Sequence, residues 1–258
     1  MSFAQLTLTA LPDFPLVQPG DDLAALILRG LQAAQIQLAD GDVLAVAQKI
    51  VSKAEGRTVR LSQVTASARA QELAALTHKD ARFVEVVLSE SKEVLRAHAN
   101  TLIVEHRLGF VCANAGVDRS NVGPHAAGDD DVLLLLPINP DATCEALRAR
   151  LHAVTGANVG VLINDSHGRA WRMGTVGVAL GAAGLPALLD LRGQPDLFDY
   201  ALQVTQVGLA DELAAAASAL MGQANEGRPV VHLRGVPYPF REGNAQELIR
   251  PKSMDLFR

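Results

Sequence analysis

Apolar residues recur three and four positions apart in five stretches of the chain, which is the spacing of one face of an α-helix. In the first stretch, Asp21 and Asp22 can cap the helix. Leu23, Ile27 and Leu31 would then form its buried face. The same spacing predicts further helices over residues 67–77, 81–91, 141–156 and 209–222.

Continuous apolar runs predict β-strands between these helices. The run 158–165 has no polar alternation, so the strand should be buried on both faces. The run 43–47 is expected to be a buried strand that leads into a polar turn rich in lysine. Further strands are predicted over residues 101–106, 109–115, 131–137 and 228–236.

Residues 166–188 contain five glycines, which predicts tight turns and close approach of the backbone to a neighbour. Helices and strands alternate irregularly along the chain. This order favours the α+β class (a mixed α/β fold) over a regular Rossmann or barrel winding. The sequence also lacks the two commonest glycine-rich nucleotide loops.

Composition limits the class of protein. Of the 258 residues, 49% are apolar and 20% are charged, enough for one large domain or two modest ones. No uncharged apolar run is long enough to span a membrane, and the N-terminal residues MSFAQLTLTALPDF contain no basic region of a signal peptide, so a cytoplasmic protein is expected. The net charge of −5 argues against nucleic acid as a partner. Cys112 and Cys144 are interpreted as cytosolic thiols.

The stretch "VCANAGVDRSNV", residues 111–122, places many short polar side chains directly after an apolar run. The Asp118 carboxylate, with amides and hydroxyls around it, suits a hard divalent cation. Asn114 and Asn121 could bind a base or a ribose edge. The alternative is a network of Asx-turns that satisfies its own backbone.

Lysine is scarce, with five residues against eighteen arginines, yet Lys49 and Lys53 lie four positions apart after the 43–47 strand. A lysine there can act as a point charge on phosphate oxygens, and a solvated turn is the alternative.

The segment "LINDSHGRAWRMG" also places polar side chains after a buried apolar run. Asp165 and Ser166 are expected at the carboxyl end of their strand, where open α/β sheets place ligands. Arg169 and Arg172 could grip a carboxylate or a phosphate, whereas His167 is the weaker candidate.

Five motifs together resemble a known family: "FPLVQPGDDL", "GDVLAVAQKIVSKAEGR", "VCANAGVDRSNV", "VLINDSHGRAWRMGTVGVALG" and "ALMGQANEG". In this order they are similar to the coenzyme F-420-0:L-glutamate ligases (gamma-glutamyl ligases), including the N-terminal part of the two-domain mycobacterial form. The resemblance covers the chain from about Phe14 to Gly235.

The resemblance implies a GTP-dependent, divalent-metal-dependent ligase. Such enzymes add L-glutamate to the terminal carboxylate of coenzyme F-420-0 and extend a gamma-linked tail. It also implies a two-domain fold particular to the family and an intertwined homodimer. Residues 1–258 would then be one ligase module with two interwoven subdomains, roughly 1–65 with 185–258, and 66–184.

The resemblance also assigns roles to residues. Asp118, Asp165 and Lys53 would be catalytic. The metal, Mg²⁺ or Mn²⁺, would be held by Asp118, Asp165, Ser166 and Gln223, and a monovalent cation could join it. Arg169 and Arg172 are candidates for contacting substrate on the chemistry given above and not on the resemblance. The nucleotide would be bound by Phe14, Pro15, Leu16, Val17, Gln48, Lys49, Lys53, Asn121, Met221, Gly222, Gln223, Ala224, Asn225, Glu226, Gly227 and Arg228.

Chemistry agrees with this assignment, because a free carboxylate must be activated before an amine can attack it. Conversion to an acyl phosphate would provide that activation, with metal and basic side chains neutralising the charge. Two alternatives remain open. One is a metal-dependent phosphohydrolase with Asp165 as nucleophile, which is disfavoured because "DSH" lacks a second acid two residues on. The other is a non-catalytic nucleotide-binding protein.

Overall fold

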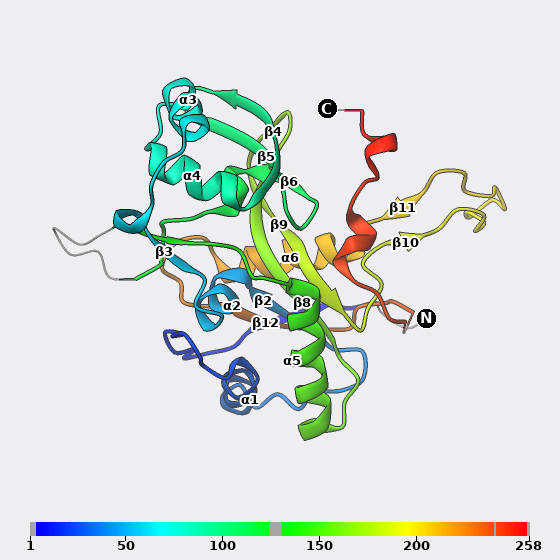
Figure 1. Cartoon of the computed structure of the whole chain (residues 1–258). Helices are drawn as coiled ribbons and strands as arrows, with labels where there is room; N and C mark the ends of the chain where they lie inside the picture. Colours follow the sequence, from blue (N-terminus) through cyan, green and yellow to red (C-terminus); the bar gives the residue numbers. More distant parts are fainter. Residues whose placement is uncertain (1–3, 124–130, 240, 257–258) are drawn as a thin grey trace.

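The computed structural model describes residues 4–123, 131–239 and 241–256. Five of the described strands form one sheet, in the order β1-β12-β2-β8-β9 (Figure 1). Their bounds are β1 (Thr7–Ala10), β12 (Val230–Arg234), β2 (Val43–Ala47), β8 (Gly160–Arg169) and β9 (Arg172–Ala183). Strands β2 and β8 are parallel, and the other neighbouring pairs are antiparallel. The predicted mixed α/β class is confirmed.

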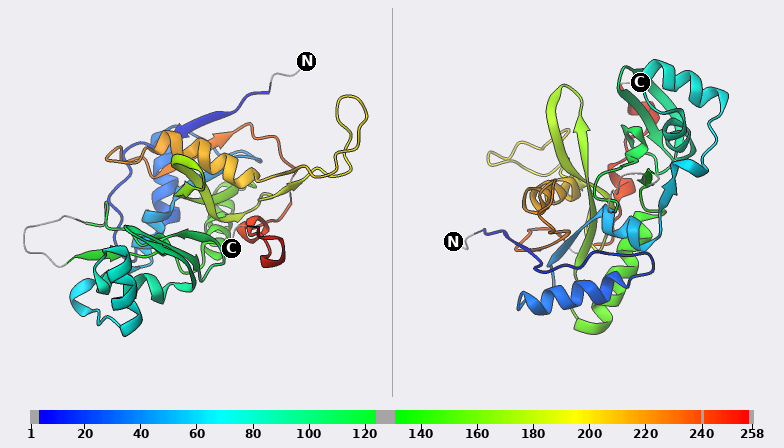
Figure 2. Two further views of the ribbon diagram at one scale, coloured as in Figure 1. Left: turned by 90° about the horizontal axis from the view of Figure 1, so that it is seen from above. Right: turned by 90° about the vertical axis from the view of Figure 1, so that its left-hand side faces the viewer.

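Helices cover both faces of this sheet (Figure 2). Leu44 and Val46 of β2 pack in one core with α1 (Leu23–Ala33) and α5 (Pro140–Thr155). The alternate residues, Val43 and Ala45, pack in a second core with α6 (Leu209–Met221). This alternation follows from the two-residue period of a strand. A strand of this kind is buried on both faces, as expected, over residues 43–46 and 160–164, whereas Asn158 precedes the strand and is exposed.

A smaller unit stands beside the β8–β9 hairpin. Helices α3 (Ala68–Thr77) and α4 (Ala81–Ser89) pack against a sheet of β4 (Ser91–His98), β5 (Thr101–His106) and β6 (Val111–Ala113). The short pair β3 (Thr58–Arg60) and β7 (Val132–Leu134) leads into and out of it, with the 3-10 turn η1 (Leu61–Gln63) after β3.

The subdomain boundaries drawn from the resemblance stay a prediction, although the pairing of the large sheet crosses them. Strand β8, expected in the 66–184 part, pairs in parallel with β2 of the 1–65 part.

Two features project from this framework. Strands β10 (Leu189–Asp190) and β11 (Gln206–Val207) begin and end an extended arm. The C-terminal segment, with 3-10 turns η3 (Ala245–Leu248) and η4 (Lys252–Met254), crosses to the small unit, where Lys252 Nζ lies 2.9 Å from Glu105 Oε2. Among the described helices, none has the length and apolar character needed to cross a bilayer.

Most predicted elements are present, with some changes at their ends. Asp22 caps α1 by accepting a hydrogen bond from the Ala25 amide at 3.1 Å, as predicted. The 81–91 helix ends at Ser89, and the 109–115 strand ends at Ala113, where the 3-10 turn η2 (Asn114–Gly116) begins. The 131–137 strand is shorter, because only residues 132–134 pair with β3.

The expected polar turn after β2 is wrong. Residues 48–54 form the helix α2 (Gln48–Ala54). Ile50 and Val51 are buried in the core shared with α1, which holds the helix against the sheet.

Close approach at the glycines is confirmed. A Cβ atom at Gly177 would collide with the carbonyl oxygen of Ala214 on α6, and one at Gly181 would lie 2.5 Å from the Pro140 carbonyl carbon. These two glycines therefore allow α6 and α5 to lie directly on β9.

Candidate functional site

The parallel pair β2 and β8 brings two predicted site segments to one place. Ala47, the last residue of β2, is in register with Asn164 of β8. Gln48, the first residue of α2, and Asp165 are the residues that come next in the two segments, so their backbones lie side by side. Asp165 does not lie at the carboxyl end of its strand as predicted. Strand β8 continues to Arg169, because residues 165–168 pair with β9.

Lys49 on α2 holds the loop that follows η2. Its Nζ atom lies 2.5 Å from Asp118 Oδ2, 2.7 Å from Ser120 Oγ and 3.0 Å from the Ser120 carbonyl oxygen. The Ser120 amide donates a hydrogen bond to Asp118 Oδ1 at 2.7 Å. The backbone of Asp118 is held as well, since it exchanges hydrogen bonds with Leu134 at 2.9 and 3.0 Å. Asp118 is thus held by Lys49, by Ser120 and by the backbone of Leu134.

The charges at this point influence one another. Burial favours the neutral form of Asp118, but the hydrogen bonds from Lys49 and Ser120 outweigh it and hold the pKa of Asp118 below its usual value. Burial lowers the pKa of Lys53, and the positive charge of Lys49 lowers it further. Two lysines and one carboxylate therefore share one small region, with a positive excess that suits an anion.

The predicted nucleotide segment 221–228 joins the same region. The Asn121 side chain donates a hydrogen bond to the Ala224 carbonyl oxygen at 3.0 Å, across 103 residues of sequence. The Ala224 amide donates to Glu226 Oε2 at 2.8 Å. The Ala47 amide donates to the Pro229 carbonyl oxygen at 2.7 Å, which fixes the end of this segment beside the start of α2.

Asp165 lies on the side of β8 that faces the small unit. His167 Nε2 is 3.2 Å from Asp165 Oδ2, and the His167 ring packs on Phe110 with centroids 5.5 Å apart. Burial raises the pKa of Cys112 to about 12, and the negative charge of Asp165 contributes. Asp165 is therefore near β6, the strand that precedes the Asp118 loop. The weaker ranking of His167 stays a prediction, and its place two residues from Asp165 on one strand face brings the two side chains together.

The oxygen atoms of this region fit a hard divalent cation. Asp118 and Asp165 offer carboxylates, and Asn114 Oδ1, in the loop before Asp118, is buried without a hydrogen-bond partner among the described residues. Within the described part of the chain, no group of three or more His, Cys, Asp and Glu side chains could hold a metal. Amide, hydroxyl, water or phosphate oxygens would have to complete a coordination shell around the two carboxylates.

Other predicted residues are placed less directly. Because side chains alternate along a strand, Ser166 and Asp165 point to opposite faces of β8, so Ser166 could join the same shell only through its backbone. Gln48 is buried and accepts a hydrogen bond from Ser52 at 3.0 Å. The Gln223 side chain donates to Ser218 Oγ at 3.0 Å.

Residues 14–17 lie between β1 and α1. Val17 is buried, while Leu16 is exposed. Arg169 and Arg172 face each other at the end of the β8–β9 hairpin. The roles predicted for all these residues stay predictions.

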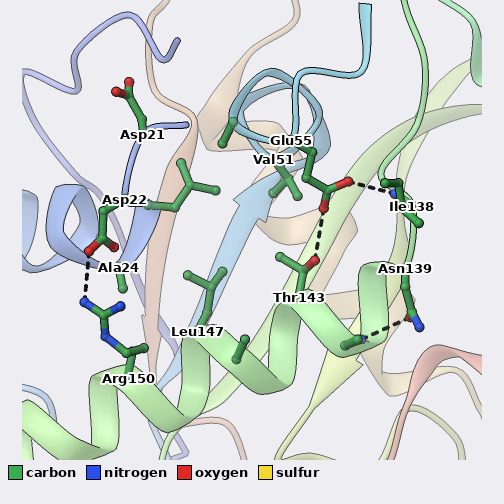
Figure 3. A pocket seen from close by; sticks show the side chains of 14 residues that line it. Asp21, Asp22, Ala24, Val51, Glu55, Ile138, Asn139, Thr143, Leu147 and Arg150 are labelled. Carbon is green, nitrogen blue, oxygen red and sulfur yellow. Dashed lines mark hydrogen bonds and ion pairs between the residues drawn. The ribbon is translucent and has the colours of Figure 1, made fainter. Parts of the chain in front are cut away.

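A pocket of about 590 Å³ lies on another side of α2 (Figure 3). Val51, Ala54 and Glu55 line it together with α5 and the residues before α1. The ion pair of Arg150 with Asp22, at 2.9 Å, borders it. None of the predicted site residues contributes to its lining. The polar convergence around Lys49 and Asp118, and not this mostly apolar hollow, is therefore the candidate site.

The site combines two lysines, two separated carboxylates and a backbone segment that is hydrogen-bonded to the Asp118 loop, an arrangement typical of enzymes that use a metal-bound nucleotide. Comparison with known proteins agrees. The family described as F420-0:Gamma-glutamyl ligase matches residues 13–235. The chain belongs to this family, and it is a ligase.

Similar proteins align over almost their whole length. The coenzyme F420:L-glutamate ligase of Methanothermobacter thermautotrophicus is 43% identical over 255 residues, which cover 98% of this chain and 99% of the relative. The protein of the same name from Methanopyrus kandleri is 46% identical over 246 residues, covering 94% and 93%. That of Methanocaldococcus jannaschii is 44% identical over 225 residues, covering 87% and 88%.

Proposed function

We propose that this ligase uses GTP to join L-glutamate to the terminal carboxylate of coenzyme F-420-0, and then extends a gamma-linked polyglutamate tail. It would act in the cytoplasm as a homodimer. One observation carries the proposal. The α2 lysines, the Asp118 loop and the 221–228 segment converge beside the end of β2, where β2 pairs with the part of β8 that precedes Asp165. The relatives' names supply the substrates.

The reaction follows in two steps. A carboxylate oxygen of F-420-0 attacks the γ-phosphorus of GTP, the bond to the β-phosphate oxygen breaks, and GDP leaves. The amine of glutamate then attacks the acyl carbon, the C–N bond forms, and inorganic phosphate departs as the ammonium proton is lost. Activation as an acyl phosphate converts a poor electrophile into a good one without a protein nucleophile.

The chain's own residues would position and neutralise the reactants. Lys49 and Lys53 would contact phosphate oxygens as point charges. Asn121 and the 221–228 backbone would hold the nucleoside. Asp118 and Asp165 would hold Mg²⁺ or Mn²⁺, which when bound neutralises phosphate charge, and Ser166, Gln223 and a monovalent cation would complete that part of the site.

The test separates three activities. The protein is incubated with GTP, Mn²⁺, F-420-0 and glutamate, and with each acceptor omitted in turn. A ligase releases GDP only when both acceptors are present, and mass spectrometry shows products heavier by whole glutamyl units. Phosphate release without acceptors would instead support a phosphohydrolase. Nucleotide binding without turnover would support a non-catalytic nucleotide-binding protein.

A further inference from the structure

The tip of the β8–β9 hairpin carries an unusual tryptophan. Strand β8 ends at Arg169 and β9 begins at Arg172, so Ala170 and Trp171 form a two-residue turn. Trp171 is the single tryptophan of the chain, and it is 84% exposed. Large aromatic side chains normally contribute to cores or interfaces. An indole ring this exposed is accessible to a planar ligand.

The backbone at Trp171 adds to this argument. Its φ is +58°, in the left-handed region that turns normally give to glycine or asparagine. A bulky residue there costs about 1 kcal/mol or more relative to glycine. The strained turn is nevertheless held firmly, because Arg169 Nη2 donates to the Met173 carbonyl oxygen at 2.7 Å. The turn thus presents the indole ring at the expense of local stability.

The hairpin also connects this tip with the candidate site. Side chains of Asp165 and His167 lie on one face of β8 by the alternation of a strand, and Arg169 ends the strand after an irregularity in its pairing with β9. Arg169 is four positions further along the strand than Asp165, which is about 13 Å at the usual rise per residue. The hairpin therefore leads from a predicted metal carboxylate to a guanidinium and then to an indole ring.

We propose that Trp171 is the binding platform for the ring system of F-420-0, a deazaflavin whose polyol chain carries phospholactate and so ends in the terminal carboxylate. The planar ring stacks on the indole, and Arg169 and Arg172 pair with the phosphodiester that follows it. The polyol and phosphate chain then places the terminal carboxylate toward Asp165. The inference rests on the proposed function for the identity of the acceptor. It adds residues that choose the acceptor by its aromatic end, far from the reacting atoms.

The single tryptophan makes the proposal measurable without turnover. A hydroxylated 5-deazariboflavin, which has the ring and polyol but no phosphate, is titrated into the full chain while indole fluorescence is followed. Stacking should quench most of the emission, with saturation. The affinities of Trp171 variants, which lack the indole signal, are followed through the fluorescence of the deazaflavin itself.

Three variants sharpen the test. Trp171→Ala should raise the KM for F-420-0 by about 10-fold, as expected for loss of one stacking contact, and leave the KM values for GTP and glutamate unchanged. Trp171→Phe should keep most of the affinity. Arg172→Gln should weaken F-420-0 but not the phosphate-free deazariboflavin. Leu256→Ala, which alters another apolar side chain that is 85% exposed, is the matched control and should change nothing.

Each outcome decides. The platform is overturned if deazariboflavin does not quench the wild-type indole and Trp171→Ala leaves the KM for F-420-0 unchanged. The platform is also overturned if Trp171→Ala keeps the KM for F-420-0 but no longer forms a dimer in light scattering. The tip would then be a contact between subunits. If wild type ligates nothing yet deazariboflavin still quenches Trp171, the proposed function fails and the platform stands.

Discussion

Lys49 on α2 and Asp118, 69 residues later, form an ion pair with Nζ 2.5 Å from Oδ2. The ammonium group is in contact with Oδ2, so a divalent cation that bound this oxygen would have to displace it. Phosphate oxygens of a nucleotide would compete for the same ammonium. We therefore expect Lys49 to link cation binding to nucleotide binding.

The first prediction tests this link. Lys49→Met should bind Mn²⁺ roughly tenfold more tightly than wild type in the absence of nucleotide, since the cation no longer displaces an ammonium ion. Isothermal titration calorimetry measures the change, and Lys92→Met, at an exposed strand position, is the control. Equal affinities in all three proteins would contradict the competition.

A second prediction concerns acid stability. The pKa of Asp118 is lower in the folded chain than in the unfolded chain, so its contribution is complete above the unfolded pKa and is lost as pH falls through the folded pKa. The Tm difference between wild type and Asp118→Asn should therefore be constant from about pH 7 to pH 5 and shrink below about pH 4. Thermal unfolding at a series of pH values measures it. A difference that does not shrink at all between about pH 5 and about pH 2 would count against the ion pair.

For Lys53, the expected effect is on nucleotide binding and not on folding. Lys53→Met should raise the KM for GTP or lower kcat, and Lys53→Arg should retain part of the activity. Because burial already disfavours the charged form, stability should change by no more than roughly 0.5 kcal/mol. Steady-state kinetics and chemical denaturation together check this. Normal kinetics in Lys53→Met would remove the assignment.

Asp118 and Asp165 should act as a unit. Asp118→Asn and Asp165→Asn should each abolish most activity, and the double variant should be little worse than either. Adding Mn²⁺ with GTP should raise the Tm of wild type by ligand linkage and have much less effect on both single variants. If the two losses multiply and the thermal shift survives, the carboxylates do not share a site.

The predicted homodimer has a visible candidate contact. The arm between β10 and β11 exposes Leu197 (97%), Phe198 (89%) and Val204 (83%). A dimer of two 27.3 kDa chains would have a mass of about 55 kDa by light scattering, and it would bury such apolar side chains. Leu197→Asp combined with Phe198→Asp should shift the mass toward the monomer. A monomeric wild type at micromolar concentration would refute the dimer.

Periodicity was sufficient to predict the larger elements. Helices α1, α5 and α6 carry their apolar stripes over three or more turns, and β2 and the first half of β8 are continuous apolar runs. The short helix α2 was missed because its seven residues offer only Ile50 and Val51 as large apolar residues. Tertiary packing against the sheet, and not local pattern, makes these residues helical.

Contacts between residues far apart in the sequence explain the features that the sequence could not predict. The polar half of β8 reads as a loop, yet it is a strand because β9 supplies its hydrogen bonds. Residue types identified Lys49, Asp118 and Asn121 as candidates, but nothing in their spacing shows that Lys49 pairs with Asp118 or that Asn121 reaches Ala224. Such pairings are set by the topology of the sheet.

The strand order of the large sheet also governs when the chain can fold. Strand β2 pairs on one side with β8 and on the other with β12, and Thr7 of β1 lies opposite Arg234. By contrast, residues 68–113 of the small unit contact one another within a short span. During synthesis the small unit should therefore form first. Strand β2 (residues 43–47) would stay without its hydrogen-bonding partners β8 and β12 until those strands have been synthesised. A nascent chain of this kind is one that chaperones should bind, and slow refolding after dilution from denaturant is its counterpart in the test tube.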